Sequence, residues 1–329
     1  MTLIAPTLEA FFTERLAGQR QASPHTISSY RDSLKLLLGF ASQRTGTTAS
    51  RLDFADLDAP LIGAFLDHLE RDRGASAQTR NARLAAIRSL FRFAALRHPE
   101  HAALIQRVLA IPGKRHDRTD VCFLTREEIE ALLAAPDRSS WTGRRDHALL
   151  VLAAQTGLRV SELTSLRRQD LHLGASAYLT CTGKGRKSRS TPLTRQTVKV
   201  ITAWLRETPG DSSAPVFPGP RGGPLSRDAV RRMVTRHWQA AARTCPSLQA
   251  KHVTAHTLRH SCAMALLRAG IDLATIALWL GHEHIATVQI YLHADLALKE
   301  QALAKAGGPQ ATPRRYRAPD SLIAFLNGL

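Results

Sequence analysis

Apolar side chains recur at the spacing of an α-helix throughout the first 111 residues, which predicts an all-helical region. Four or so helices are expected there, over residues 7–20, 24–40, 58–69 and 77–97. Ser23 followed by Pro24 is typical of a helix start, because serine caps free amides and proline fits the first turn. Residues 1–111 are therefore predicted to form a compact helical bundle.

The pattern changes at residues 111–118, where proline and glycine interrupt the helical period and charged residues follow. Residues 112–121 are predicted to be a basic linker, and residues 122–306 a second domain. This domain begins with a capping box from Thr125 to Glu128 and contains a β-hairpin over residues 177–193 among further helices. The expected fold class is mainly α, with an N-terminal helical bundle and an α+β domain that holds a small antiparallel sheet.

Residues 307–329 are expected to form a separate C-terminal tail. A basic segment leads to Pro319 and Asp320, which would cap a short helix with an apolar face made of Leu322, Ile323, Phe325 and Leu326. A helix this short is unstable alone, so its apolar face needs a surface to dock on. Docking on its own domain and docking on a neighbouring copy both remain open.

The net charge indicates which class of partner the protein binds. Lys and Arg total 45 against 27 Asp and Glu, which gives a net charge of +18 and a pI near 10.9. This excess favours nucleic acid over an anionic membrane, because no apolar run approaches the roughly 20 residues of a spanning helix. The N-terminus also lacks the pattern of a secretory signal, and the four cysteines are far apart. We expect a cytoplasmic, nucleoid-associated protein with reduced cysteines.

Three groups of basic residues are candidates for contacts with a phosphate backbone. They lie on the predicted helix over residues 77–97, in the linker, and on a helix that begins at Ser226; their members are Arg80, Arg83, Arg88, Lys114, Arg115, Arg227, Arg231 and Arg232. A solvated helix face is the alternative interpretation of the first group. The third helix is a candidate to enter a DNA groove.

Histidine, arginine and tyrosine gather in the last third of the chain without an accompanying carboxylate. His256 and Arg259 are three residues apart, so they share one face of a helix, and His282 and Tyr291 follow. These donors match phosphate oxygens, and a phenol can attack phosphorus. Each residue alone could be a hydrogen-bonded core side chain. Together they predict phosphoryl transfer.

Two cofactor motifs are incomplete. His256 and His260 have the spacing of the zinc motif H-E-x-x-H, but Thr257 occupies the position of its glutamate. Gly183-Lys184 suggests a nucleotide-binding loop, but Lys184 is followed by glycine and no glycine stands five positions before Gly183. Neither a metal nor a cofactor is predicted.

The order and spacing of these segments resemble the tyrosine recombinases, the phage integrase and Xer-like group. The similar segments are TGLRVSEL at 156–163, TGKGRKSR at 182–189, HTLRH at 256–260, LGH at 280–282 and TVQIYLH at 287–293. Residues 26–40 and 77–93 are similar to the helical core-binding domain of that family, which binds DNA. The resemblance extends over nearly the whole chain.

The resemblance implies a catalytic set, with Glu162 in support, made of Arg159, Lys184, His256, Arg259, His282 and the nucleophile Tyr291. Tyr291 would attack the scissile phosphate and leave a 3′-phosphotyrosine, while Lys184 would protonate the departing 5′-oxygen. Because free tyrosine titrates near pH 10, the phenol needs a base, and His256 is the candidate. Arg159 and Arg259 would hold the non-bridging oxygens. Glu162 would orient the guanidinium of Arg159.

The resemblance further implies strand exchange through a Holliday junction, in a homo-tetramer on two double-stranded DNA sites. A second recombinase could be a partner, and the role could be integration, excision or resolution of mobile or replicon DNA. Two alternatives stay open. One is a topoisomerase of the same chemistry, which reseals its own strand, and the other is a DNA-binding regulator that has lost catalysis.

Overall fold

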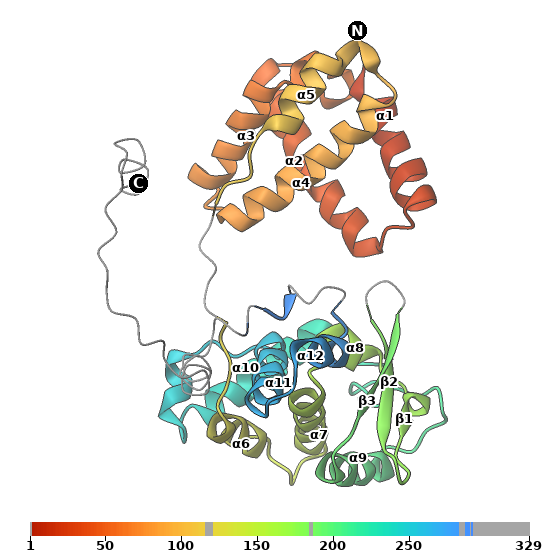
Figure 1. Cartoon of the computed structure of the whole chain (residues 1–329), viewed down its shortest axis with the longest axis vertical. Helices are drawn as coiled ribbons and strands as arrows, with labels where there is room; N and C mark the ends of the chain where they lie inside the picture. The colour runs from red at the N-terminus through yellow and green to blue at the C-terminus, as the bar shows by residue number, and fades with distance from the viewer. Residues whose placement is uncertain (1, 116–120, 184–186, 283–286, 290, 292–329) are drawn as a thin grey trace, which may run out of the picture. The chain divides into compact units, whose positions relative to one another are not determined.

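The computed structural model describes residues 2–115, 121–183, 187–282, 287–289 and 291. Its contacts divide the chain into two compact units, Met1–Thr119 and Asp120–Leu329 (Figure 1). The tail over residues 307–329 and the predicted helix from residue 285, apart from its few described positions, lie outside the described residues. Among the described residues, no helix combines the length and apolar character needed to cross a bilayer.

The first unit is a helical bundle. Its helices are α1 (Ile4–Ala10), the π-helix η1 (Phe11–Gln19), α2 (Pro24–Thr45), α3 (Ala59–Arg71), α4 (Ala77–Ala95) and α5 (Ala102–Ala110), with short 3-10 turns η2 (Ala49–Arg51), η3 (Ala55–Leu57) and η4 (Pro99–His101). The side chain of Ser23 accepts a hydrogen bond from the amide of Thr26, and Asp58 caps α3 through the amide of Leu61. The first helix begins at Ile4, earlier than predicted.

The second unit surrounds a small sheet with helices. Its elements are α6 (Arg126–Ala134), α7 (Trp141–Thr156), α8 (Val160–Ser165), η5 (Arg168–Asp170), β1 (Leu171–His172), β2 (Tyr178–Thr182), β3 (Ser188–Pro192), α9 (Arg195–Glu207), α10 (Arg227–Ala241), η7 (Pro246–Ala250), α11 (Ala255–Arg268) and α12 (Leu273–Leu280). The strands are antiparallel in the order β1-β2-β3, with Cys181 opposite Arg189. The predicted fold class, mainly α with a small antiparallel sheet, is confirmed.

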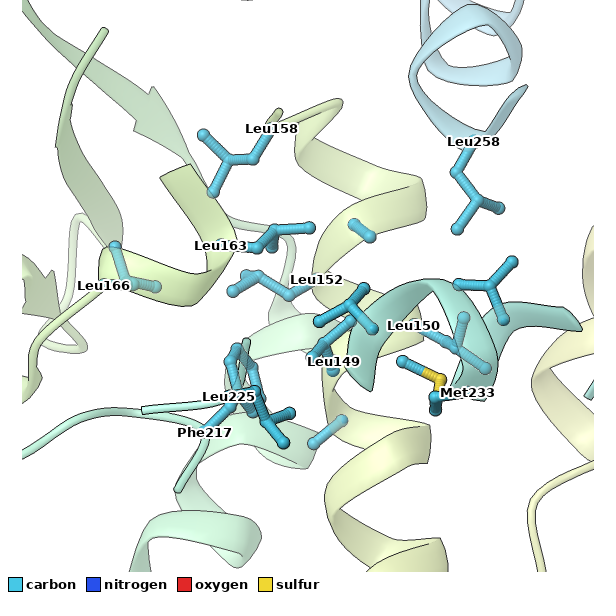
Figure 2. Packing of buried hydrophobic residues seen from close by; sticks show 14 of the residues in the cluster. Leu149, Leu150, Leu152, Leu158, Leu163, Leu166, Phe217, Leu225, Met233 and Leu258 are labelled. Carbon is cyan, nitrogen blue, oxygen red and sulfur yellow. The ribbon is translucent and has the colours of Figure 1, made fainter. Parts of the chain in front are cut away.

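Leucines around α7 form the core of this unit. Leu149, Leu150 and Leu152 are buried, although they point in different directions from α7, because other elements cover this helix on several sides (Figure 2). Leu158 and Leu258 belong to the same cluster and are 1% and 0% exposed. Burying one leucine stabilises the fold by about 1.5–3 kcal/mol. The residues that follow these two leucines are therefore anchored by the core.

Two glycines end helices where the chain must turn sharply. Gly157 ends α7 with φ of 63°, and Gly281 ends α12 with φ of 66°. A Cβ atom on Gly157 would lie 2.7 Å from a methyl carbon of Leu280. This close approach brings the segment after α7 against the end of α12, although more than a hundred residues separate them in the sequence.

Two buried carboxylates tie other helices together. Asp146 on α7 is 0% exposed and accepts hydrogen bonds from Arg145, Arg236 and His237, the last two on α10. Burial alone would raise the pKa of Asp146, but the bonds from His237 and Arg145 hold that pKa below its usual value. Glu128, which completes the predicted capping box of α6, binds Lys251 at 2.6 Å. These contacts fix α6 and α10 relative to α7 and to the chain before α11.

Candidate functional site

Arg159 stands at the start of α8, where it is the N-cap residue. Its Nη1 donates to Oε1 of Glu162 at 2.9 Å, and its backbone amide donates to Oε2 at 2.8 Å. The contact predicted between Arg159 and Glu162 is therefore present. Nη2 of Arg159 donates to the carbonyl of Gly281 at 3.1 Å. The guanidinium thus bridges the start of α8 and the end of α12.

Arg259 lies on α11 and is 1% exposed. Its Nη1 donates to the carbonyl of Gly157 and its Nη2 to that of Leu280, each at 2.7 Å. Burial, followed by repulsion from Arg159, lowers the pKa of Arg259 to about 10, so the group stays charged at neutral pH. Its hydrogen-bond acceptors at these two atoms are neutral carbonyls, so its positive charge is not cancelled there.

His282 follows Gly281 directly and contacts Arg259. The Nη2 of Arg259 lies 3.0 Å from Nε2 of His282. Arginine can only donate, so this imidazole nitrogen accepts and the ring proton sits on Nδ1. Burial and the charge of Arg259 lower the pKa of His282 to about 4. A neutral His282 therefore has one N–H left to offer an anion.

Tyr291 is 1% exposed and packs among apolar residues of α11 and α12. Its phenol oxygen lies 2.8 Å from Nδ1 of His260. The ring of His256 contacts the ring of His260, and their centroids are 4.3 Å apart. Burial raises the pKa of Tyr291 to about 12. Burial and the neighbouring His256 lower the pKa of His260 to about 4, so it is neutral at pH 7.

The sequence named His256 as the candidate base for the phenol, whereas in this structure the imidazole at hydrogen-bond distance from the phenol oxygen is that of His260. The two residues are four apart, so both lie on the same side of α11, and burial distinguishes them. His256 is the more exposed of the two, and desolvation, followed by the charges of Arg259 and Arg159, lowers its pKa. The sequence analysis included His260 in the rejected zinc motif and at the end of the HTLRH segment, but gave it no role in the reaction.

A pocket of about 770 Å³ opens over this site. Among the described residues, six arginines and one acid line it. The arginines are Arg159, Arg227, Arg231, Arg232, Arg236 and Arg259, and the acid is Asp228. Arg231 lies 3.3 Å from that carboxylate, and the His256 side of α11 completes the wall. The three α10 arginines that the sequence proposed for DNA contact thus share one cavity with Arg159 and Arg259.

The candidates in the first unit have partners within the protein. Arg80 lies 3.5 Å from a carboxylate oxygen of Glu70, Arg83 donates to the hydroxyl of Ser33 at 2.9 Å, and Arg88 donates to the carbonyl of Ile111. Lys114 also pairs with Glu70, at 3.0 Å. Arg115 is exposed. The interpretation of Arg80, Arg83 and Arg88 as a freely solvated face is wrong, because all three are only partly exposed. Their contact with DNA stays a prediction.

Lys184, which follows β2 in the sequence, lies outside the described residues. The described strands pair from Thr182 opposite Ser188, and the amide of Gly183 donates to the carbonyl of Lys187 at 2.8 Å. The predicted hairpin is therefore present up to the residue before Lys184. The structure describes the other predicted site residues, which are Arg159, Glu162, His256, Arg259, His282 and Tyr291. Among them, Arg159 contacts Glu162 and Arg259 contacts His282.

Comparison with known proteins identifies the family of this chain. Residues 122–297 match the phage integrase family, and residues 10–98 match its N-terminal SAM-like domain. The chain belongs to the phage integrase family. Members of this family are tyrosine recombinases, enzymes that cleave and rejoin DNA.

Relatives cover most of the chain. The protein y4rC of Sinorhizobium fredii, named an integrase/recombinase, is 56% identical over 326 residues, which cover 99% of this chain and 98% of the relative. The tyrosine recombinase XerC of Xanthomonas campestris is 36% identical over 284 residues, covering 86% and 83%. The resemblance to the phage integrase and Xer-like group is therefore confirmed.

Solved structures share the fold. XerH site-specific recombinase bound to its palindromic difH substrate gives a TM-score of 0.70 at 22% identity, over 89% of this chain and 83% of that one. A lambda integrase dimer bound to a COC′ core site gives 0.65 at 19% identity, over 96% and 81%. At these identities the likeness concerns the fold alone.

Proposed function

We propose that this chain is a site-specific DNA recombinase that cuts and rejoins strands through a covalent bond to Tyr291. The observation that supports it most is the buried charge of Arg259 beside Arg159 on one pocket. Arg259 donates to two neutral carbonyls and an imidazole, so the pocket keeps a net positive charge where a phosphate would sit. Guanidinium groups placed in advance stabilise the charge that grows on phosphate oxygens in the transition state.

In the proposed step, the phenol oxygen of Tyr291 forms a bond to phosphorus, and the bond from phosphorus to the 5′-oxygen breaks. A 3′-phosphotyrosine and a 5′-hydroxyl result. Lys184 gives its proton to the departing oxygen. Because one phosphoester replaces another, the step needs no ATP, and a 5′-hydroxyl from another strand can reverse it.

The phenol proton goes first to His260 in this proposal, because His260 is the imidazole at hydrogen-bond distance from the phenol oxygen. His256 lines the pocket instead and would donate a hydrogen bond to the phosphate. Tyr291 is covered in this structure, so its phenol must turn toward the pocket when DNA binds. His282 would donate to the phosphate through Nδ1.

The assembly is also part of the proposal. Residues 1–111 would form the DNA-binding bundle, 112–121 a linker, 122–306 the catalytic domain and 307–329 the tail. Four copies on two DNA sites would exchange strands through a Holliday junction, alone or with a second recombinase, on DNA of the nucleoid. The tail would dock on the neighbouring copy. Removing residues 318–329 should then allow cleavage of one site and prevent recombination of two; recombination at the normal rate would contradict docking between copies.

The test of the covalent step uses a nicked DNA substrate that traps the protein–DNA complex. The wild-type protein should form a covalent complex, and Tyr291→Phe should bind the DNA with similar affinity and form none. Wild-type levels of complex in Tyr291→Phe would refute the assignment and direct attention to Tyr316.

The same protein separates the two alternatives. Relaxation of a supercoiled plasmid that contains no specific site would favour a topoisomerase. DNA binding with no covalent complex from the wild-type protein on its own recombination site would favour a regulator. The site can be searched for in DNA that flanks the gene.

A further inference from the structure

A third arginine, Arg189, reaches the site from β3 without lining the pocket. It stands opposite Cys181 in the hairpin and shares the inward side of β3 with the buried Thr191. Its side chain is 11% exposed. An arginine in this position does not touch a phosphate in the pocket, so any role in the reaction must act through its neighbours.

Arg189 donates hydrogen bonds to both carboxylate oxygens of Glu162. Its Nη2 donates to Oε2 at 2.8 Å and its Nη1 donates to Oε1 at 3.0 Å, the same oxygen that accepts from Arg159. Burial alone would raise the pKa of Glu162, but the hydrogen bonds from Arg189 help to keep it below its usual value. One buried carboxylate is thus shared by two guanidinium groups, and Arg189 holds it with two donors.

The end of α12 joins the same network. Three consecutive carbonyls accept from three arginines: Trp279 from Nε of Arg189 at 3.1 Å, Leu280 from Arg259 at 2.7 Å and Gly281 from Arg159 at 3.1 Å. The last carbonyls of a helix have no acceptor role within it, so they are available to such donors. Arg189 and Arg159 therefore both link the end of α12 to Glu162, and of these two arginines only Arg159 lines the pocket.

Gly183, directly after β2, also packs closely against Arg189. A Cβ atom on Gly183 would lie 3.2 Å from Nη1 of Arg189 and 3.2 Å from Oε1 of Glu162, so only glycine packs there without a shift. Lys184 comes next in the chain. The Arg189–Glu162 pair therefore packs closely against Gly183, the first residue after β2.

We infer that Arg189 is a positioning residue for DNA cleavage, which occupies Glu162 so that the Arg159 guanidinium stays presented to the phosphate. Without Arg189, the Arg159 guanidinium, which now donates only to Oε1 of Glu162, can also donate to Oε2. A two-pronged pair between them would draw the Arg159 guanidinium away from the pocket and cancel its charge. This inference rests on the proposed function, because it takes Arg159 as a group that acts on DNA.

The experiment measures two quantities for each variant: the rate of covalent-complex formation at saturating nicked DNA, and the affinity for the same DNA. The variants are Arg189→Gln, Arg189→Lys, Glu162→Gln and the double variant. Arg144→Gln is the matched control, because Arg144 makes an ion pair of 2.7 Å with Glu207 between α7 and α9, away from the pocket. Tyr291→Phe provides the blank.

We expect Arg189→Gln to slow cleavage by about 10- to 100-fold, as a shift of about 1 Å in a catalytic group can do, with affinity changed by less than about 3-fold. Arg189→Lys should recover part of the rate, because it keeps one donor and the charge. In the Glu162→Gln background, Arg189→Gln should slow cleavage by less than about 3-fold, because no carboxylate is left to capture Arg159. Arg144→Gln should cleave at the wild-type rate.

Equal slowing by Arg189→Gln in both backgrounds would overturn the inference, and so would a wild-type rate or a loss that follows only the fraction of folded protein. If Arg189→Gln does not fold, Arg189→Lys decides by the same cycle. Failure of the proposed function would be visible elsewhere: the wild-type protein itself would give no complex above the Tyr291→Phe blank, and the role of Arg189 would fall with it.

Discussion

Replacing Gly281 with alanine tests the geometry of the site at its tightest point. Gly281 has φ of 66°, where an L-residue costs about 1–2 kcal/mol. Its new Cβ would lie 2.6 Å from Nη1 of Arg189 and 3.0 Å from Cζ. Arg189 is held by Glu162 and a carbonyl, so a shift weakens hydrogen bonds of a charged group, which are worth about 1.5–3 kcal/mol each. We expect Gly281→Ala to lower the free energy of unfolding by roughly 3–5 kcal/mol.

Gly270→Ala is the matched control, because Gly270 also has a positive φ, of 83°, but a Cβ there meets nothing within 4 Å. It should lose only the backbone contribution, about 1–2 kcal/mol. Urea unfolding followed by tryptophan fluorescence measures both, since all four tryptophans, Trp141, Trp204, Trp238 and Trp279, lie in the second unit.

The same two variants separate stability from catalysis. Gly281→Ala should also slow cleavage by about 10- to 100-fold at a temperature where it is still folded, because the carbonyl of Gly281 holds Arg159. Gly270→Ala should cleave normally. Equal losses of stability in the two variants, or an unchanged cleavage rate in Gly281→Ala, would refute the packing argument.

Three further predictions concern charge. Arg159→Lys keeps the charge and loses the planar donor pair, so cleavage should fall by about 100-fold with DNA affinity almost unchanged; a parallel loss of affinity would make Arg159 a docking residue. The pKa values of His260 and His282, about 4 in the folded protein, lie below the unfolded value near 6.5, so unfolded chains bind more protons between these pH values. The free energy of unfolding should therefore fall by roughly 2 kcal/mol per histidine from pH 7 to pH 5, and His282→Asn should show a smaller fall in urea titrations. Asp146→Asn should destabilise the second unit by about 3–5 kcal/mol by leaving Arg145 buried without its carboxylate, whereas Asp228→Asn on the surface should not.

Local rules within the sequence were enough for several elements of the fold. The caps predicted at Ser23 and at Thr125 are present, and so is the hairpin that frames the position of Lys184. These features depend on residues within a few positions of one another, so spacing determines them. The net charge of +18 likewise follows from composition and favours a polyanionic partner without any knowledge of the fold.

The sequence also contained the segments of the site, because their order and spacing resemble the phage integrase and Xer-like group. It did not determine which of two histidines on α11 meets the phenol. His256 and His260 lie on the same side of one helix, and only the packing of Tyr291 against that helix brings His260 to 2.8 Å. Helical spacing describes one element, whereas this contact joins residues 31 positions apart.

The tertiary structure alone decided the roles of the remaining arginines. Arg80, Arg83 and Arg88 form a regular basic row in the sequence, but each reaches a partner that lies at a distance along the chain. In the sequence, Arg189 is one of several basic residues in the hairpin. In the structure it donates to Glu162, 27 residues earlier, and to the carbonyl of Trp279, 90 residues later. A guanidinium is long and carries donors on several sides, so its role depends on which acceptors the folded chain brings within reach. That choice is made by packing between elements, which spacing along the chain does not encode.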